Sequence, residues 1–355
     1  MNFSSDNVTG AAPEILAALA RANAGAVPSY GADPLTARVE ERLAELFERE
    51  VAAFPVTTGT AANALALATL TPPWGAVYAH VESHVEVDEC GAPEFYTGGA
   101  KLVLLPGTDG KMTAAALAAR LPAGKGNVHQ VQPAAVSLTQ ATEAGTVYTV
   151  AEIGAITDVA KRYGMAVHMD GARFANAVAT LGCRPAELTW RAGVDVLSFG
   201  ATKNGALAAE AVVFFDKARA EEFAFRRKRA GHLLSKMRFL SAQLDAYLAD
   251  DLWLRNAVRA NAMAARLARG LGDLPGARLS YPVQANEVFI ELPEAMIRAL
   301  QADGFRFYRW GGDDSRCVRL VTAFDTAESD VEALLASARH HAADSHDESQ
   351  GRASC

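Results

Sequence analysis

The sequence predicts an α/β protein with a second, smaller domain. Between Val51 and Phe215, seven short apolar segments alternate with helical segments, an order typical of a mostly parallel sheet covered by helices. From Gly276 onward the order of strand-like and helical segments is instead typical of an α+β domain. With 355 residues, 50% of them hydrophobic, the chain is long enough to form both cores.

The elements of the large domain follow in order. A helix is expected at 13–23, because proline suits a first turn, and another at 35–47, where apolar residues recur on one face. The seven strands are expected at 51–56, 77–80, 101–106, 134–139, 165–170, 194–200 and 211–215. Further helices are expected at 61–69, 113–121, 151–163 and 173–181, and we therefore place the large domain at 13–245.

The small domain is expected at 246–341. One long helical run, 235–271, leads out of the large domain. Strands then follow at 278–281, 287–292, 305–309 and 318–321, with helices at 294–303 and 327–341. The remaining polar tail, 342–355, is predicted to be disordered.

Composition bounds the class of function. The chain has 34 Lys and Arg against 41 Asp and Glu, a formal net charge of −7, which opposes general binding to nucleic acid or anionic membranes. No stretch approaches the roughly 18 apolar residues of a membrane span, and no signal sequence is recognisable, so we expect a cytoplasmic protein with a small-molecule substrate. The four cysteines show no CxxC spacing and are expected to be reduced thiols; no metal site is expected.

Lys203 is the first candidate catalytic residue. It closes the stretch VDVLSFGATK, an apolar strand followed by small residues. A lysine held at a strand end and partly removed from water can lose its proton and attack a carbonyl, as Schiff-base chemistry with an aldehyde cofactor requires. A strand-terminal lysine is more often simply solvated, so this signal is weak alone.

A second predicted strand strengthens the case for a catalytic Lys203. MAVHMDGA delivers Asp170 to its end, with Arg173 three residues on, and Lys203 lies 33 residues after Asp170. A pyridoxal 5'-phosphate (PLP) enzyme needs a carboxylate to pair with the protonated ring nitrogen and a lysine to hold the aldehyde carbon. The pair of strands therefore predicts PLP as the cofactor.

Two further stretches fit that cofactor. In TTGT, Gly59 and Thr60 stand where a strand turns into an Ala-rich helix, so free backbone N–H groups and the helix dipole can bind a phosphate. A simply capped helix is the alternative. His84 lies in a polar loop just past a strand end, the usual place for a functional side chain in an open α/β sheet. A surface histidine is the alternative there.

Together these segments resemble the low-specificity L-threonine aldolases. This family contains fold type I PLP enzymes of the aspartate aminotransferase superfamily, and its bacterial branch includes phenylserine aldolases. The resemblance rests on SSDNVTG (4–10), YGADP (30–34), TTGTAAN (57–63), HMDGARFANAV (168–178), SFGATKNG (198–205) and VRLVTAFDT (318–326). The segment TQATEAGTVY (139–148) differs from the sequence of the broader family and is similar to that of the bacterial branch, so no individual contacts are assigned to its residues.

The resemblance implies a PLP-dependent transferase-like fold and further roles. Residues 1–12 would fold over the active site, and Ser5 would hydrogen-bond the substrate carboxylate. Arg319 lies on a predicted strand and would bind the same carboxylate, because its planar guanidinium can hold a carboxylate through two hydrogen bonds. Arg173 would contact the carboxylate or the phenolic oxygen of the cofactor. His84 would stack on the cofactor ring and is also the candidate base.

The resemblance also implies an assembly. Lys228 and Arg238 are the nearest matches to residues that reach the cofactor phosphate of a neighbouring subunit. A homotetramer, a dimer of dimers, is therefore expected.

The predicted function is retro-aldol cleavage of L-threonine, L-allo-threonine or a related β-hydroxy-α-amino acid, including phenylserine, to glycine and an aldehyde. Two alternatives on the same fold are a β-eliminating lyase and an amino acid racemase, because the reaction depends on which bond at Cα is aligned. A non-catalytic regulator is the third alternative. Lys203, Asp170 and Arg319 together argue against it.

Overall fold

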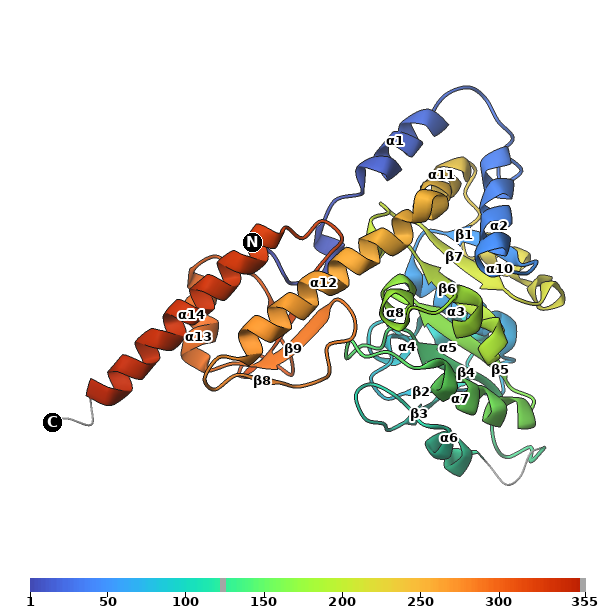
Figure 1. Cartoon of the computed structure of the whole chain (residues 1–355). Helices are drawn as coiled ribbons and strands as arrows, with labels where there is room; N and C mark the ends of the chain where they lie inside the picture. The colour runs from blue at the N-terminus through green and yellow to red at the C-terminus, as the bar shows by residue number, and fades with distance from the viewer. Residues whose placement is uncertain (122–125, 352–355) are drawn as a thin grey trace.

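The protein consists of two lobes joined by one long helix, α12 (Leu252–Gly272), as Figure 1 shows. The computed structural model describes residues 1–121 and 126–351, with side chains as far as residue 343. The larger lobe holds a seven-stranded sheet, and the smaller lobe holds a four-stranded sheet with helices packed around it.

The seven-stranded sheet is mostly parallel, as predicted. Its order is β1-β7-β6-β5-β4-β2-β3, and only β7 runs antiparallel to its neighbours. The strands are β1 (Ala52–Val56), β2 (Gly75–His80), β3 (Lys101–Leu105), β4 (Gln132–Thr139), β5 (Ala166–Gly171), β6 (Val196–Gly200) and β7 (Glu210–Phe214). The central strands are buried on both faces, which explains their continuous apolar runs.

Helices cover both faces of this sheet. They are α1 (Pro13–Ala22), α2 (Pro34–Leu46), α3 (Gly59–Leu70), α4 (His84–Val87), α5 (Ala92–Thr97), α6 (Ala114–Arg120), α7 (Val150–Arg162), α8 (Phe174–Leu181), α9 (Pro185–Leu188), α10 (Phe223–Arg229) and α11 (Arg238–Leu248). The Ala-rich α3 is buried on every side, because its small side chains let the helix lie close to the sheet and to α5.

An aromatic cluster supports the sheet beneath the predicted site. The ring of Phe199, in β6, lies 6.1 Å from Phe174, 5.9 Å from Tyr247 and 6.5 Å from Trp253. These rings come from α8, α11 and α12, so they tie β6 to three helices. Aromatic burial of this size dominates the local packing energy and holds the strand that leads to Lys203 in place.

The small lobe is α+β. Its antiparallel sheet has the order β10-β11-β9-β8, from β8 (Arg278–Leu279), β9 (Glu287–Glu291), β10 (Tyr308–Arg309) and β11 (Cys317–Val321). Helices α12, α13 (Glu294–Ala302) and α14 (Glu328–Gly351) pack around it. Helix α14 thus begins near the predicted position and runs past residue 342, where the tail was expected to begin, while residues 352–355 lie outside the described part.

The N-terminal segment, residues 1–12, contacts both lobes. Asn2 bridges to Arg306, and the Phe3 backbone bonds with Arg306 and Val321 at 2.7 and 2.8 Å. At its other end, the Ala12 amide donates to the Gly205 carbonyl at 2.8 Å, two residues after Lys203. The segment therefore runs from the small sheet to the loop that carries Lys203.

One helix boundary was predicted wrongly. The run 235–271 is two helices, α11 and α12, separated at Ala249–Asp251. Asp250 and Asp251 take left-handed φ values of 50° and 53°. Aspartate tolerates this conformation better than most residues, whereas the apolar periodicity of the flanking helices hides the break.

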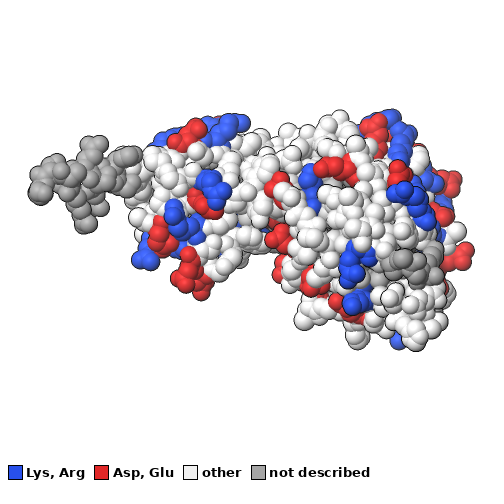
Figure 2. Space-filling model, turned by 90° about the horizontal axis from the view of Figure 1, so that it is seen from below, with Lys and Arg blue, Asp and Glu red and all other residues white. Residues whose placement is uncertain are grey.

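The basic segment of α10 is only partly solvated. Arg227 is buried over the Phe54 ring and donates to the Pro55 carbonyl at 3.3 Å, and burial lowers its pKa to about 10. On the face drawn in Figure 2, Lys and Arg side chains are interspersed with Asp and Glu. No helix in the described part of the chain combines the length and the hydrophobicity needed to cross a membrane. Of the cysteines, Cys90, Cys183 and Cys317 are free, and Cys355 lies outside the described residues.

Candidate active site

The carboxyl ends of four neighbouring strands meet at the predicted site. In sheet order these are β6, β5, β4 and β2, which are parallel to one another. Lys203 follows β6, Asp170 lies in β5, Glu143 follows β4 and His84 follows β2. The structure therefore brings the three predicted residues, Lys203, Asp170 and His84, to one edge of the sheet, and adds Glu143.

Asp170 is held rigidly. One carboxylate oxygen accepts from the Ala172 amide at 2.9 Å, and the other accepts from Asn63 Nδ2 at 2.7 Å. Two residues earlier, His168 is buried between Ser137 and Ser198, with contacts of 3.0 and 2.9 Å. Burial lowers the pKa of His168 to about 4, so its ring is neutral at physiological pH and serves to fix the strand.

Lys203 lies in the 3-10 turn η3 (Thr202–Asn204), where it is partly exposed. The turn is fixed by Asn204, whose amide donates to the Tyr247 hydroxyl and the Trp253 carbonyl, each at 2.7 Å. Within residues 1–121 and 126–343, no hydrogen bond or ion pair engages the Lys203 amine. The amine lies within electrostatic range of three buried carboxyl groups, those of Asp6, Glu210 and Glu287.

His84 is bound to a buried carboxylate. Its Nδ1 lies 2.9 Å from Glu89 Oε1, and Glu89 also accepts from Asn63 at 2.8 Å. The hydrogen bond to Glu89 raises the pKa of His84, and burial only partly opposes this. Asn63 therefore links Glu89 to Asp170, and these hydrogen bonds explain why the ligand atoms of His84, Glu89 and Asp170 lie within 4.8 Å of one another.

A second charged network joins the two lobes. Arg173 donates to both oxygens of Asp6, at 2.8 and 3.1 Å, and its Nη1 lies 3.3 Å from Glu287. Arg319 lies 3.9 Å from Glu287 and donates to the Ser4 carbonyl at 3.2 Å. Burial raises the pKa of Glu287, and Arg173 opposes it. The two predicted carboxylate-binding arginines therefore flank one buried acid.

The remaining predicted substrate residue, Ser5, lies beside this network. Its Oγ accepts from the Asn7 amide at 3.1 Å and caps the short turn η1 (Asp6–Val8). The neighbouring Ser4 carbonyl is the acceptor for Arg319. Ser5 thus follows directly after the residue that Arg319 contacts, and its role in carboxylate binding stays a prediction.

The predicted phosphate site is a helix N-terminus. Gly59 and Thr60 open α3, and the Thr58 side chain accepts from the Ala61 amide at 3.1 Å. A Cβ added to Gly59 would meet nothing within 4 Å, so space lies beside the first turn. Thr57 contacts His232 Nδ1 at 2.9 Å and draws that ring to the same turn.

Lys228 and Arg238 lie apart from these groups. The exposed Lys228 amine is 4.8 Å from the centre of the Tyr30 ring, and Arg238 donates to the Gly25 carbonyl at 3.0 Å. Neither side chain has a recorded contact with Lys203, Asp170 or Arg319 in the described residues. Their predicted role at a neighbouring subunit stays a prediction.

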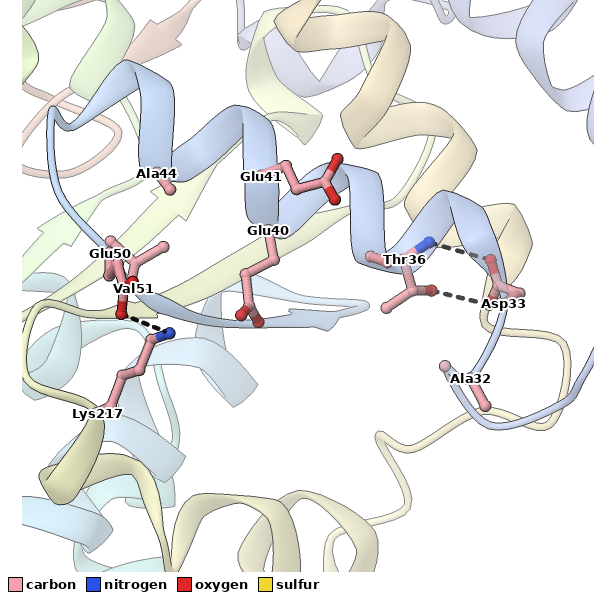
Figure 3. Close-up of a pocket in the computed structure, with 11 residues that line it drawn as sticks. Ala32, Asp33, Thr36, Glu40, Glu41, Ala44, Glu50, Val51 and Lys217 are labelled. Atoms are coloured by element: carbon pink, nitrogen blue, oxygen red, sulfur yellow. Dashed lines mark hydrogen bonds and ion pairs between the residues drawn. The ribbon is translucent and has the colours of Figure 1, made fainter.

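Figure 3 shows a cavity that lies away from the residues described above. It has a volume of about 520 Å³ beside α2 and β1, and it contains an ion pair of 3.1 Å between Lys217 and Glu50. Its other charged residues, including Glu40 and Glu41, are acidic. None of the predicted site residues lines it, so we assign it no part in the site.

Comparison with known proteins decides the family. The model of the beta-eliminating lyase family matches residues 2–295. The low-specificity L-threonine aldolase of Pseudomonas aeruginosa is 48% identical over 337 residues, which cover 95% of this chain and 96% of that protein.

The chain belongs to the beta-eliminating lyase family. The predicted resemblance to low-specificity L-threonine aldolases and the assignment as a lyase are confirmed. The structure of Leishmania major threonine aldolase superposes with a TM-score of 0.90 at 30% identity, covering 96% of this chain and 99% of that one. The predicted fold class is confirmed as well. The same fold occurs in an Oryza sativa structure that contains PLP and tryptamine (TM-score 0.74, 15% identity, 97% and 83% coverage).

The residues of this lyase fit PLP. The buried Asp170 can pair with a ring nitrogen, the free Lys203 amine can join an aldehyde, and α3 offers N–H groups to a phosphate. Several buried polar atoms of the site have no hydrogen-bond partner in the described residues, namely Asn63 Oδ1, Glu89 Oε2, Glu143 Oε2, Asn286 Oδ1 and Arg319 Nε. Because such atoms rarely stay unpaired, their clustering indicates a ligand site.

Sequence reasoning missed most of the buried acids. Asp6, and the amide Asn63 that links two of the acids, lie inside the motifs SSDNVTG and TTGTAAN, where a polar side chain was the only sequence signal for a role in the site. Glu143 lies in TQATEAGTVY, whose contacts were left open. Glu89 and Glu287 carried no local signal, because an acid near a strand end or at a strand start is usually solvated.

Proposed function

We propose that this protein uses PLP to cleave L-threonine, L-allo-threonine or a related β-hydroxy-α-amino acid to glycine and an aldehyde. The observation that carries the proposal is the pairing of a free Lys203 amine with a buried, doubly hydrogen-bonded Asp170 on neighbouring strands. The 48% identity to a low-specificity L-threonine aldolase supports the reaction. PLP, when bound, supplies an aldehyde that joins an amine and a ring that takes up the electron pair released at Cα.

Substrate binding would depend on Arg319. Its Nε is buried and unpaired among the described residues, and its guanidinium is held over the Tyr308 and Trp310 rings at 5.7 and 5.2 Å. A planar guanidinium fixed in this way can take a carboxylate bidentately. Ser5 and Arg173 would complete the carboxylate site, so that the Cα–Cβ bond is oriented for cleavage.

Proton transfer at the β-hydroxyl would involve His84. Its ring lies at the end of β2, anchored by Glu89, and within electrostatic range of Asp170 and Lys203. His84 is the base that the resemblance predicts, directly or through a water molecule, and a role without proton acceptance, such as stacking, is the alternative. Lys203 can return the proton to Cα.

We propose further that the protein is a cytoplasmic homotetramer whose sites lie between subunits. The exposed Lys228 and the partly buried Arg238, which make no hydrogen bond or ion pair with the charged network among the described residues, support this arrangement, because they remain available to a phosphate across an interface.

The test is an absorbance spectrum of purified protein with PLP, followed by aldehyde detection after adding L-threonine or phenylserine. A visible band plus glycine and aldehyde supports the proposal, and Lys203→Ala should abolish both. A band with a keto acid or with the other enantiomer would replace the aldolase by the eliminating lyase or the racemase. No band with added PLP would overturn the cofactor.

A further inference from the structure

Glu143 occupies a place in the site that the predicted roles leave unused. It follows β4, the strand that lies between β5, which carries Asp170, and β2, which precedes His84. Its Oε1 accepts a hydrogen bond from the His84 backbone amide at 2.6 Å. The carboxyl group is therefore fixed directly against the turn that begins at the candidate base.

The second carboxyl oxygen of Glu143 lacks a hydrogen-bond donor in the described part of the protein. Oε2 is buried and has no hydrogen-bond partner among the described residues. A buried carboxyl oxygen without a hydrogen-bond partner has lost its hydration without a compensating interaction. Such an atom in a ligand site is expected to meet a ligand.

The charges around Glu143 are those of the reaction site. Asp170 from β5 acts on it electrostatically, and Glu143 acts in turn on Arg173 and on Tyr148. Burial raises its pKa to about 7, and Asp170 adds to this, while interactions with the His84 amide, its own amide and the Thr139 side chain oppose it. At neutral pH the group therefore exchanges between carboxylate and carboxylic acid, the condition in which proton transfer is most efficient.

His84 is in a different state. Its Nδ1 is engaged by Glu89, and this hydrogen bond raises the pKa of the ring, which makes His84 better suited to donate a hydrogen bond than Glu143 is. The two groups on either side of the same turn are therefore suited to opposite tasks.

We propose that Glu143 accepts the β-hydroxyl proton of the substrate, with His84 beside it as a hydrogen-bond donor. In this step the O–H bond breaks and its proton passes to Glu143 Oε2. The O–H electron pair forms the carbonyl bond of the aldehyde, and the pair of the broken Cα–Cβ bond stays with the glycine moiety. The inference rests on the proposed function, because it concerns that same site.

Glu143→Gln in the holoenzyme tests the assignment. Glutamine keeps the size and the acceptor for the His84 amide but cannot take the proton. We expect kcat/KM for cleavage to fall about 10²–10⁴-fold, while exchange of the glycine α-proton in D₂O, which involves no hydroxyl, stays within about threefold. Glu143→Asp should restore part of the cleavage, because it restores a carboxylate.

A second readout does not depend on turnover. Infrared pH-difference spectra of the resting protein should contain carboxylic acid bands that titrate near neutral pH, from Glu143 and from Glu210. The Glu143 band is the one that remains in Glu210→Gln and is missing in Glu143→Gln. Glu94→Gln is the matched control, because Glu94 Oε2 is also buried and unpartnered in the described residues. It should leave both the band and the cleavage rate unchanged.

The outcomes are separable. Unchanged cleavage in Glu143→Gln, or equal losses of cleavage and glycine exchange, would overturn the role of Glu143 as the proton acceptor. Glycine exchange by the wild type without cleavage of any β-hydroxy amino acid would instead overturn the proposed function.

Discussion

Arg173 donates two hydrogen bonds to Asp6, at 2.8 and 3.1 Å, although the two residues are 167 positions apart in the chain. Asn286, from the small lobe, donates to the same carboxylate at 3.0 Å. Burial alone would raise the pKa of Asp6, but Arg173 and Lys203 outweigh burial and lower it. One carboxylate thus connects the N-terminal segment to both lobes.

Asp6→Asn should therefore destabilise the protein by about 3 kcal/mol, because it leaves the buried Arg173 with a weaker partner. Denaturant unfolding at neutral pH measures the difference, with the exposed Asp88→Asn as control. The sign follows from the lowered pKa: the contribution is present above the ordinary aspartate pKa and is lost as pH falls through the folded-state value. Equal midpoints for wild type and Asp6→Asn would contradict this account.

Arg319→Lys should raise KM for the amino acid about 10–100-fold, with a smaller change in kcat. Lysine cannot make the bidentate contact, and charge-assisted hydrogen bonds of this kind are worth about 1.5–3 kcal/mol. Steady-state kinetics measures the split. Arg316→Lys is the control, because Arg316 is exposed and donates to the Leu292 carbonyl. An unchanged KM in Arg319→Lys would remove Arg319 from the carboxylate site.

Glu89→Gln should lower the pKa of His84. The hydrogen bond to Glu89 is the main cause that raises this pKa, and burial, which remains, acts in the opposite direction. An NMR titration of the His84 ring protons would follow the change directly, and the exposed Glu86→Gln serves as control. A pKa that stays in place would mean that Asp170, not Glu89, sets the charge on His84.

Glu210→Gln should change how stability depends on pH. Glu210, in β7, accepts from the Ala201 amide at 3.1 Å, and burial raises its pKa from 4.5 to about 7. A raised carboxyl pKa stabilises the folded state below the unfolded value, and this contribution is lost as pH rises through 7.

Wild type should therefore lose about 3 kcal/mol relative to Glu210→Gln between pH 4.5 and pH 7. The measurement is the unfolding free energy of both proteins at several pH values across that range. Parallel curves for the two proteins would show that Glu210 does not titrate there.

The sequence predicted the strands well because buried parallel strands leave a strong local signal. Each of the seven apolar runs is short, continuous and bounded by turn residues, so its burial on both faces can be read without the fold. Lys203 and Asp170 follow from the same signal, since each closes such a run. Their roles stay predictions until the proposed experiments are made.

The contacts between distant segments could not be predicted in this way. Asp6 and Glu287 look like ordinary solvated acids until the fold places Arg173 and Arg319 beside them. The break at Asp250 is hidden for a related reason, because apolar periodicity continues on both sides of it. Arg227 stands in a run of four basic residues, 226–229, which by itself is typical of a solvated helix face, and only the position of Phe54 buries it.

Lys203, Asp170, Glu143 and His84 each lie at or after the end of a separate strand, so the sheet anchors the backbone of each one independently. A change at Glu143, in the loop after β4, would therefore alter proton transfer, while cofactor attachment stays with the strands β5 and β6. The buried side chains of Gln140, Thr142 and Thr146 hold this loop, so position 143 can be varied while its backbone stays in place.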